Sequence, residues 1–162
     1  MTGSSGIPEG RLPGRGPFSR HASCCGTDFF KAELEGADFT RVLGHGVYLA
    51  KSDLHEARLE HGEFWHDNFN EASCRNASFA GADLSFCDFR SAHLGGTNLS
   101  GVQFAATDLT GAFLDTDTRL AGATGIERGV TATMIRFEGE EIVGDDAKEL
   151  LGKLARQPLE RR

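Results

Sequence analysis

The sequence predicts an all-β solenoid, in which the chain winds in stacked coils around an apolar axis. Between positions 24 and 114, every fifth residue is Leu or Phe at 16 of 19 places. The residue two places earlier is usually small, and the residue between them is often Asp or Asn. Five residues advance an α-helix by about 500°, so these side chains would scatter around a helix. Because an odd step also alternates the faces of a straight strand, the backbone must turn a corner between repeats.

The same period explains the smaller residues of each repeat. Alternate residues of an extended segment share a face, so the Leu or Phe and the small residue two places before it point inward together. The Asp or Asn between them, and the Gly often found two residues after the Leu or Phe, are turn formers. Cys24, Gly44 and Cys74 replace the large residue, but the register continues beyond each of them. We therefore expect one solenoid over residues 21–126.

Segments such as Ala37-Asp38-Phe39-Thr40-Arg41 and Ala82-Asp83-Leu84-Ser85-Phe86 resemble the A(D/N)LXX motif of pentapeptide-repeat proteins. The resemblance implies a right-handed quadrilateral β-helix with four repeats in each coil. The 19 repeats then form about five coils, and the rod is about 24 Å long. Residues 20 apart in the sequence are expected to stack directly along the axis.

Residues 127–162 follow the repeats and have a different pattern, after a slip of the register. Apolar residues at 133–137 and 141–143 indicate two short strands, joined by a turn at 138–140. Apolar residues at helical spacing then indicate an amphipathic helix that ends before Pro158. Because the end of a solenoid is an exposed sheet edge, we expect a C-terminal β-hairpin and α-helix cap.

This C-terminal segment offers more apolar side chains than one small coil end needs. We therefore expect it to pair two protomers into a homodimer as well as to cap the solenoid, and a cap alone is the alternative. The candidate residues for the cap and the dimer contact are Met134, Ile135, Phe137, Leu150, Leu151 and Leu154.

Residues 1–20 read as a flexible arm, because they contain five Gly, three Pro and three Arg and few apolar residues. The chain has no apolar run long enough for a membrane span, and its N-terminus lacks the apolar core of a signal peptide. We therefore expect a cytoplasmic protein without a membrane partner. The net charge of −7 argues against direct nucleic-acid binding.

The sequence contains none of the common catalytic motifs, such as G-x-S-x-G, a phosphate-binding Gly loop, H-E-x-x-H or C-x-x-C. Its six His are dispersed, and a filled rod has no deep cleft. We therefore expect no enzymatic activity, no catalytic residues, no metal and no cofactor.

Asp67 breaks the repeat pattern, because it occupies an inward position between Val47 and Cys87 in its column. A carboxylate buried without partners is costly. A local bulge that supplies backbone N–H donors, or exposes the side chain, is one interpretation. An ion or ligand site that uses Asp67 and His66 is the other.

Exposed aromatic residues suggest how such a rod acts. Trp65 and Phe86 point outward by register in successive coils, and His66 is expected to stack beneath Phe86. A cluster of exposed aromatic side chains is typical of a contact with another protein. We therefore expect a protein-binding scaffold, with Trp65, His66 and Phe86 as candidate contact residues.

An acidic strip supports an alternative function. Two outward columns on adjoining faces contain the candidate strip residues Asp28, Glu63, Asp83, Asp88 and Asp108. The family resemblance implies a DNA-mimicking modulator of DNA gyrase or topoisomerase, of the fluoroquinolone-resistance or toxin self-resistance type. However, residues 22–115 contain 14 Asp or Glu against 6 Lys or Arg, whereas 24 Å of duplex DNA carries about 14 charges. This charge falls well short of that of DNA, and a dimer that doubles the length would only partly rescue this alternative.

Overall fold

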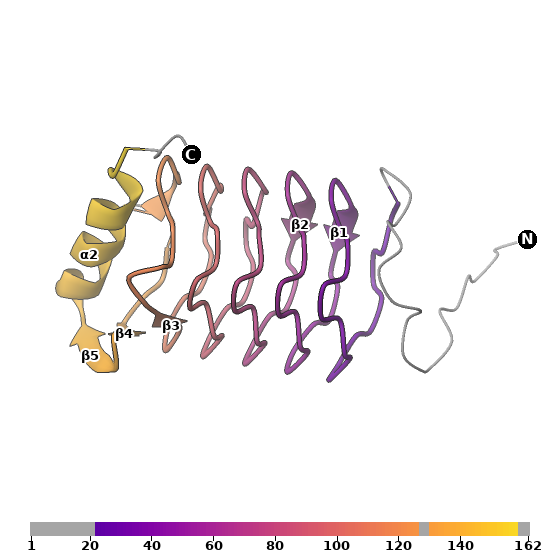
Figure 1. Cartoon of the computed structure of the whole chain (residues 1–162), viewed down its shortest axis with the longest axis horizontal. Helices are drawn as coiled ribbons and strands as arrows, with labels where there is room; N and C mark the ends of the chain where they lie inside the picture. The colour runs from indigo at the N-terminus through magenta and orange to yellow at the C-terminus, as the bar shows by residue number, and fades with distance from the viewer. Residues whose placement is uncertain (1–21, 127–129, 159–162) are drawn as a thin grey trace, which may run out of the picture.

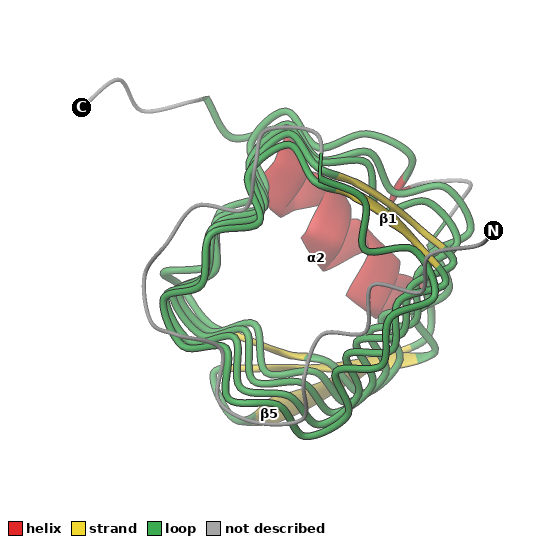
Figure 2. Cartoon of the chain, turned by 90° about the vertical axis from the view of Figure 1, so that its right-hand side faces the viewer, coloured by secondary structure: helices red, strands yellow, loops and turns green. Residues whose placement is uncertain are grey.

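The structure is a computed structural model that describes residues 22–126 and 130–158, and the predicted arm of residues 1–20 lies outside this part of the chain. The described chain winds into a row of stacked coils that ends at helix α2 (Asp145–Ala155) (Figure 1). A view along the row shows a closed, four-sided path (Figure 2). The quadrilateral β-helix predicted from the sequence is therefore confirmed.

Successive coils pair in parallel with a spacing of 20 residues. Leu43–His45 (β1) pairs with Glu63–Trp65 (β2), and Leu43 lies opposite Glu63. The other sides of the coils form single parallel bridges, such as those from Tyr48 to Asn68 and from Asn68 to Asp88. This pairing satisfies backbone groups that a corner-turning chain would otherwise bury without partners.

The inward Phe and Leu side chains fill the axis of the solenoid. The rings of Phe69 and Phe89 stack with their centroids 4.5 Å apart and their planes 5° from parallel. Phe79 meets both rings edge-on, at 5.7 Å and 5.8 Å. Small inward residues such as Ala72 and Ala92 are also fully buried beside these rings. The alternation of large and small residues lets the coils pack closely without leaving voids.

The Asp or Asn before each Leu or Phe forms the corner of the coil. Asp28 Oδ1 accepts a hydrogen bond from the N–H of Phe30 at 2.8 Å, and Asp88 Oδ1 accepts one from Arg90 at 2.9 Å. The same Asx turn recurs at Asp38, Asp53, Asn68, Asp83, Asn98 and Asp108. Short polar side chains that bond the backbone two residues ahead favour turns. Much of the acidity of the repeats therefore has a structural cause.

The 20-residue spacing ends after Leu114, as the slip in the sequence register predicts. Asn98 pairs with Arg119 and Gln103 pairs with Thr124, so the spacing becomes 21 residues. Phe113–Leu114 (β3) then pairs in parallel with Met134–Phe137 (β4). Strand β4 pairs in antiparallel fashion with Glu140–Val143 (β5), which forms the predicted hairpin.

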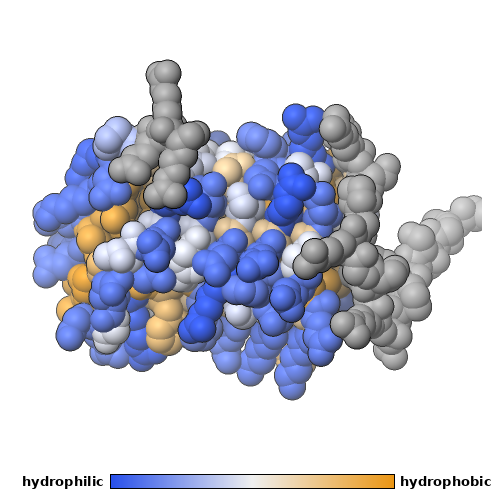
Figure 3. Space-filling view, in the orientation of Figure 1, coloured by the Kyte–Doolittle hydropathy of each residue, from blue (hydrophilic) through white to orange (hydrophobic). Residues whose placement is uncertain are grey.

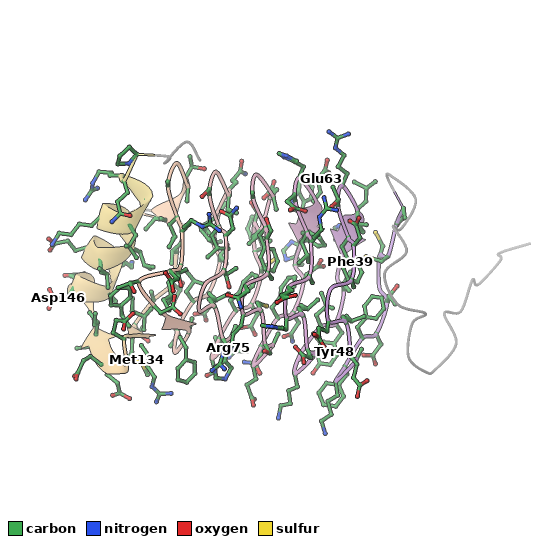
Figure 4. All side chains as sticks on the ribbon, in the orientation of Figure 1. Phe39, Tyr48, Glu63, Arg75, Met134 and Asp146 are labelled. Atoms are coloured by element: carbon green, nitrogen blue, oxygen red, sulfur yellow. The ribbon has the colours of Figure 1, made fainter. Side chains whose placement is uncertain are left out.

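Helix α2 crosses the open end of the last coil (Figure 2). Its Ala147, Leu151 and Leu154 are buried, together with Ile135 of β4. Asp146 of the first helical turn lies on the outer side of the cap, and hydrophobic surface gathers toward this end of the molecule (Figures 3 and 4). Acidic residues in the first turn and Lys153 in the last turn complement the helix dipole. The predicted hairpin–helix cap is confirmed.

Candidate partner-binding surface

Four rings form an exposed cluster at one corner of the solenoid, which we call the aromatic patch: His45, Trp65, His66 and Phe86. The His66 ring stacks on Phe86, with centroids 4.8 Å apart and planes 19° from parallel. The His45 ring of the preceding coil lies 5.8 Å from His66, with its plane tilted by 39°. Trp65 is 43% exposed and Phe86 is 52% exposed. The three residues that the sequence singles out, Trp65, His66 and Phe86, therefore lie together on one surface.

The backbone of the patch is unfavourable for large side chains. His66 and Phe86 have φ angles of 58° and 63°, in the left-handed region, and Gly46 fills the equivalent position one coil earlier with φ 67°. A side chain with a Cβ is disfavoured there, and a bulky ring more so. Phe86 also leaves half of its ring in water, so burial does not offset this cost. The same conformation recurs at other corners, as at Lys31 and Glu71, so the exposed ring and not the backbone distinguishes Phe86.

The aromatic patch occupies the corner between the two acidic columns. Glu63 and Asp83 stack in the column before the corner, and Asn68 and Asp88 stack in the column after it. Glu63 and Tyr48, which belong to different columns, lie on separate sides of the solenoid (Figure 4). The acidic strip is therefore interrupted along its middle by rings.

Arg90 offsets part of the acidic strip. Its Nη2 lies 2.6 Å from Asp88 Oδ2, and its Nε lies 4.0 Å from Asp108 Oδ2. The hydrogen bond to Asp88 raises the pKa of Arg90 above its ordinary value. Asp28 and Glu63 of the strip are exposed. The C-terminal half of the strip is thus less negative than its sequence suggests.

Asp67 lies directly after His66, and its side chain is only 1% exposed. Oδ1 accepts a hydrogen bond from the N–H of Val47 at 2.7 Å, whereas Oδ2 has no hydrogen-bond partner within the described part of the chain. Burial raises the pKa of this carboxyl group from an ordinary value of 3.8 to about 7. The sequence interpretation of a backbone donor is therefore correct for one oxygen, and the interpretation of an exposed carboxylate is wrong.

Gly44 creates the space that Asp67 enters. A Cβ atom on Gly44 would lie 2.5 Å from Asp67 Oδ2 and 2.8 Å from Phe64 Cδ1. The carboxyl group and the Phe64 ring thus share the volume of the missing inward side chain. Among residues 22–126 and 130–158, no group of three or more His, Cys, Asp or Glu could hold a metal ion. All four Cys are free thiols.

A groove of about 1030 Å³ runs along another part of the surface, and no predicted site residue lines it. Its lining includes the polar side chains of His61, Asn76, Asn98, Ser100, Arg119 and Gln157. Gly81 and Gly101, which are 20 residues apart in the sequence, leave one corner of the groove without side chains. That column of glycines is the signal by which the sequence could have indicated the groove.

The candidate cap and dimer residues divide into two sets. Ile135, Leu151 and Leu154 are buried beneath the cap. Met134, Phe137 and Leu150 are only partly buried, and Val143 next to them in the hairpin is exposed. The second set leaves an apolar rim for a second protomer, and the homodimer stays a prediction.

None of the helices in the described residues is long and apolar enough to cross a membrane. The predicted cytoplasmic location stays a prediction.

Comparisons with known proteins place the chain in a family. Pentapeptide repeats match residues 20–43, 52–96 and 82–116, in 8 copies. Curated protein sequences give no significant match. A pentapeptide repeat protein from the thylakoid lumen of Arabidopsis thaliana is 25% identical, with a TM-score of 0.56, over 87% of this chain and 84% of its own. A pentapeptide repeat protein from Nostoc is 26% identical, with a TM-score of 0.51, over 65% of this chain and 84% of its own.

A fluoroquinolone resistance protein is among the more distant structural matches. Trypsin-treated QnrB1, a plasmid-mediated fluoroquinolone resistance protein, is 16% identical, with a TM-score of 0.33, over 72% of this chain and 67% of its own. That similarity is too low to inform function. The repeat match, together with coils that stack every 20 residues and turn at Asx corners, shows that this chain belongs to the pentapeptide-repeat family.

Proposed function

We propose that this protein is a non-enzymatic scaffold that binds another protein through the aromatic patch. The stack of His66 on Phe86, with His45 and Trp65 beside it, is the observation that carries the proposal. Clustered, half-exposed rings are typical of the centre of a protein–protein contact, where aromatic residues dominate the binding energy.

The charges beside the aromatic patch indicate the chemistry of the partner. Glu63 and Asp83 stack next to it on one side, and Asp88 lies on the other. A complementary surface would surround an apolar centre with Lys or Arg, whose side chains pair with carboxylates and stack on aromatic faces. We therefore expect a basic protein surface rather than an acidic one.

The substitution Phe86→Asn separates binding from stability. Asn76 holds the equivalent corner position with φ 56°, so Asn suits this backbone. We expect Phe86→Asn to weaken partner binding about tenfold or more, while the urea midpoint for unfolding does not fall below that of wild type. The partner is first captured with the wild-type protein and identified by mass spectrometry, and its dissociation constant is then measured with each purified variant.

Phe30→Asn is the matched control for this measurement. Phe30 is 44% exposed but packs against Tyr48 on another side of the solenoid, with ring centroids 5.7 Å apart. Partner binding should survive this change. Equal affinity of wild type and Phe86→Asn for the identified partner would refute the role of the aromatic patch.

DNA gyrase modulation through the acidic strip is the second candidate function. The stacking of Asp88 on Asp108 in one column favours it. It ranks second because Arg90 offsets these two carboxylates and because Asx turns account for Asp at this position. A supercoiling assay with purified gyrase, with and without a fluoroquinolone, tests it. We expect no effect of micromolar protein, and a dose-dependent effect lost in Glu63→Gln would favour the second candidate instead.

A further inference from the structure

One carboxyl group connects the two segments that carry most of the aromatic patch. Asp67 directly follows Trp65 and His66, and its Oδ1 accepts a hydrogen bond from the N–H of Val47 at 2.7 Å. Val47 follows His45 by two residues, and the His45 ring lies 5.8 Å from the His66 ring. Backbone pairing of β1 with β2 and the hydrogen bond from Gly46 N–H to Trp65 O also join these segments, so Asp67 is one of several contacts that set the position of His45 relative to His66.

The burial of Asp67 Oδ2, without a hydrogen-bond partner from the described part of the chain, favours the neutral form of the carboxyl group. Oδ2 is buried and finds no hydrogen-bond partner among the residues that the structure describes. The titratable groups that face it across the core are the thiols of Cys24 and Cys87. Burial raises the pKa of Cys24 to about 12 and also raises that of Cys87, so both are neutral at pH 7 and neither supplies a positive charge. An ionised Oδ2 would be a poorly compensated charge in an apolar core.

An ionised Asp67 can reach water only if the backbone beside it moves. The carboxyl group fills the inward space that Gly44 leaves, since a Cβ on Gly44 would lie 2.5 Å from Oδ2. Gly44 and Gly46 flank His45, and glycine permits backbone conformations that other residues resist. A small movement of residues 44–46 would hydrate the carboxylate without displacing a side chain from the core. The same movement would carry His45 away from His66.

We propose that Asp67 is a protonation switch for the aromatic patch. The neutral carboxyl group keeps residues 44–47 docked on residues 65–67, and loss of the proton from Oδ2 loosens this corner and separates the stacked rings. The proposal rests on the proposed function of the aromatic patch, whose regulation it names. Partner binding is then expected to weaken as the pH rises through neutrality.

The sign of the effect on stability follows from linkage. Burial raises the pKa of Asp67 in the folded protein to about 7, above its ordinary value of 3.8. Between these two values the unfolded chain has released the proton and the folded protein has kept it. The free energy of unfolding therefore falls as the pH rises from about 4 to about 7, and this contribution levels off at higher pH.

Trp65 is the single tryptophan of the chain, so its fluorescence reports on the aromatic patch. In the full-length wild-type protein we expect its emission to change with a midpoint within about one unit of pH 7. Asp67→Asn keeps the shape of the side chain but cannot lose this proton, and we expect it to abolish the transition. We expect the urea midpoint of wild type to fall from pH 5 to pH 8, and that of Asp67→Asn to change less with pH.

Histidine side chains change charge in the same pH range and need a control. The double variant His45→Asn/His66→Asn removes both imidazoles of the aromatic patch but leaves Asp67 in place. We expect it to retain the transition, and the ¹³C resonance of the Asp67 carboxyl group should titrate with the same midpoint. A transition that persists in Asp67→Asn, or that disappears in the double variant, would overturn the switch.

This test can fail independently of the proposed function, because its readouts need no partner. Without a transition dependent on Asp67, the aromatic patch still binds its partner if Phe86→Asn weakens the complex. If instead Phe86→Asn binds normally while Asp67 controls Trp65, the switch stands and the proposed binding site is wrong.

Discussion

Replacing Phe89 with Ala is expected to lower the free energy of unfolding by about 3–5 kcal/mol. The Phe89 side chain is buried in the middle of the solenoid, where its ring stacks on Phe69 and meets Phe79 edge-on. Coils on both sides hold the cavity open, because their backbones are fixed by parallel pairing. The measurement is equilibrium unfolding in urea, followed by circular dichroism and by the fluorescence of Trp65.

Phe30→Ala is the control for this substitution, since Phe30 is exposed. Removing the Phe30 ring should lower the free energy of unfolding by about 0.5 kcal/mol, as is usual for surface substitutions. A similar cost for Phe89→Ala and Phe30→Ala would contradict a core held together by its stacked rings.

Replacing Leu151 with Asp is expected to detach helix α2 and to convert the protein into larger assemblies. Leu151 is fully buried between the helix and the last coil, alongside Ile135. An unpaired carboxylate at this position costs several kcal/mol, and the undocked helix uncovers the apolar end of the solenoid. Size-exclusion chromatography with light scattering measures the change in mass, and the far-ultraviolet spectrum shows whether the coils remain folded.

Leu150→Asp is the matched variant, because it introduces the same charge one residue away on the same helix. Leu150 is only partly buried, at the apolar rim of the cap. The cap should remain in place, and a wild-type homodimer, if formed through this rim, should dissociate. Equal aggregation of Leu150→Asp and Leu151→Asp would show that burial under the cap is not what protects the end.

The sequence was sufficient to predict the solenoid, its register and its cap. A five-residue period of Leu and Phe requires a backbone that turns corners, which predicts a solenoid. The number of four repeats in each coil came from the resemblance to pentapeptide-repeat proteins. The slip after Leu114 was also visible, because the spacing of the small and large residues changes there. The outward direction of Trp65, His66 and Phe86 follows from the same register, since they lie between the inward positions of successive repeats, where the chain turns a corner.

Several properties of the surface depend on contacts between coils that the repeat pattern does not specify. Arg90 reaches both Asp88 in its own repeat and Asp108 in the next coil, and so reduces the charge of the acidic strip. Of the six apolar candidates in the cap, only the structure separates Ile135, Leu151 and Leu154, which are buried, from those at the rim.

Asp67 shows most clearly which properties the sequence could not determine. The sequence alone determined that Asp67 occupies an inward position, because position in the repeat sets the direction of a side chain. Only the tertiary structure decided its surroundings: the Val47 N–H as donor, and the space over Gly44 as its place in the core. The reason is physical, since the repeat fixes local backbone geometry, whereas the environment of a buried group depends on atoms one coil away, which are 20 or more residues distant in the chain.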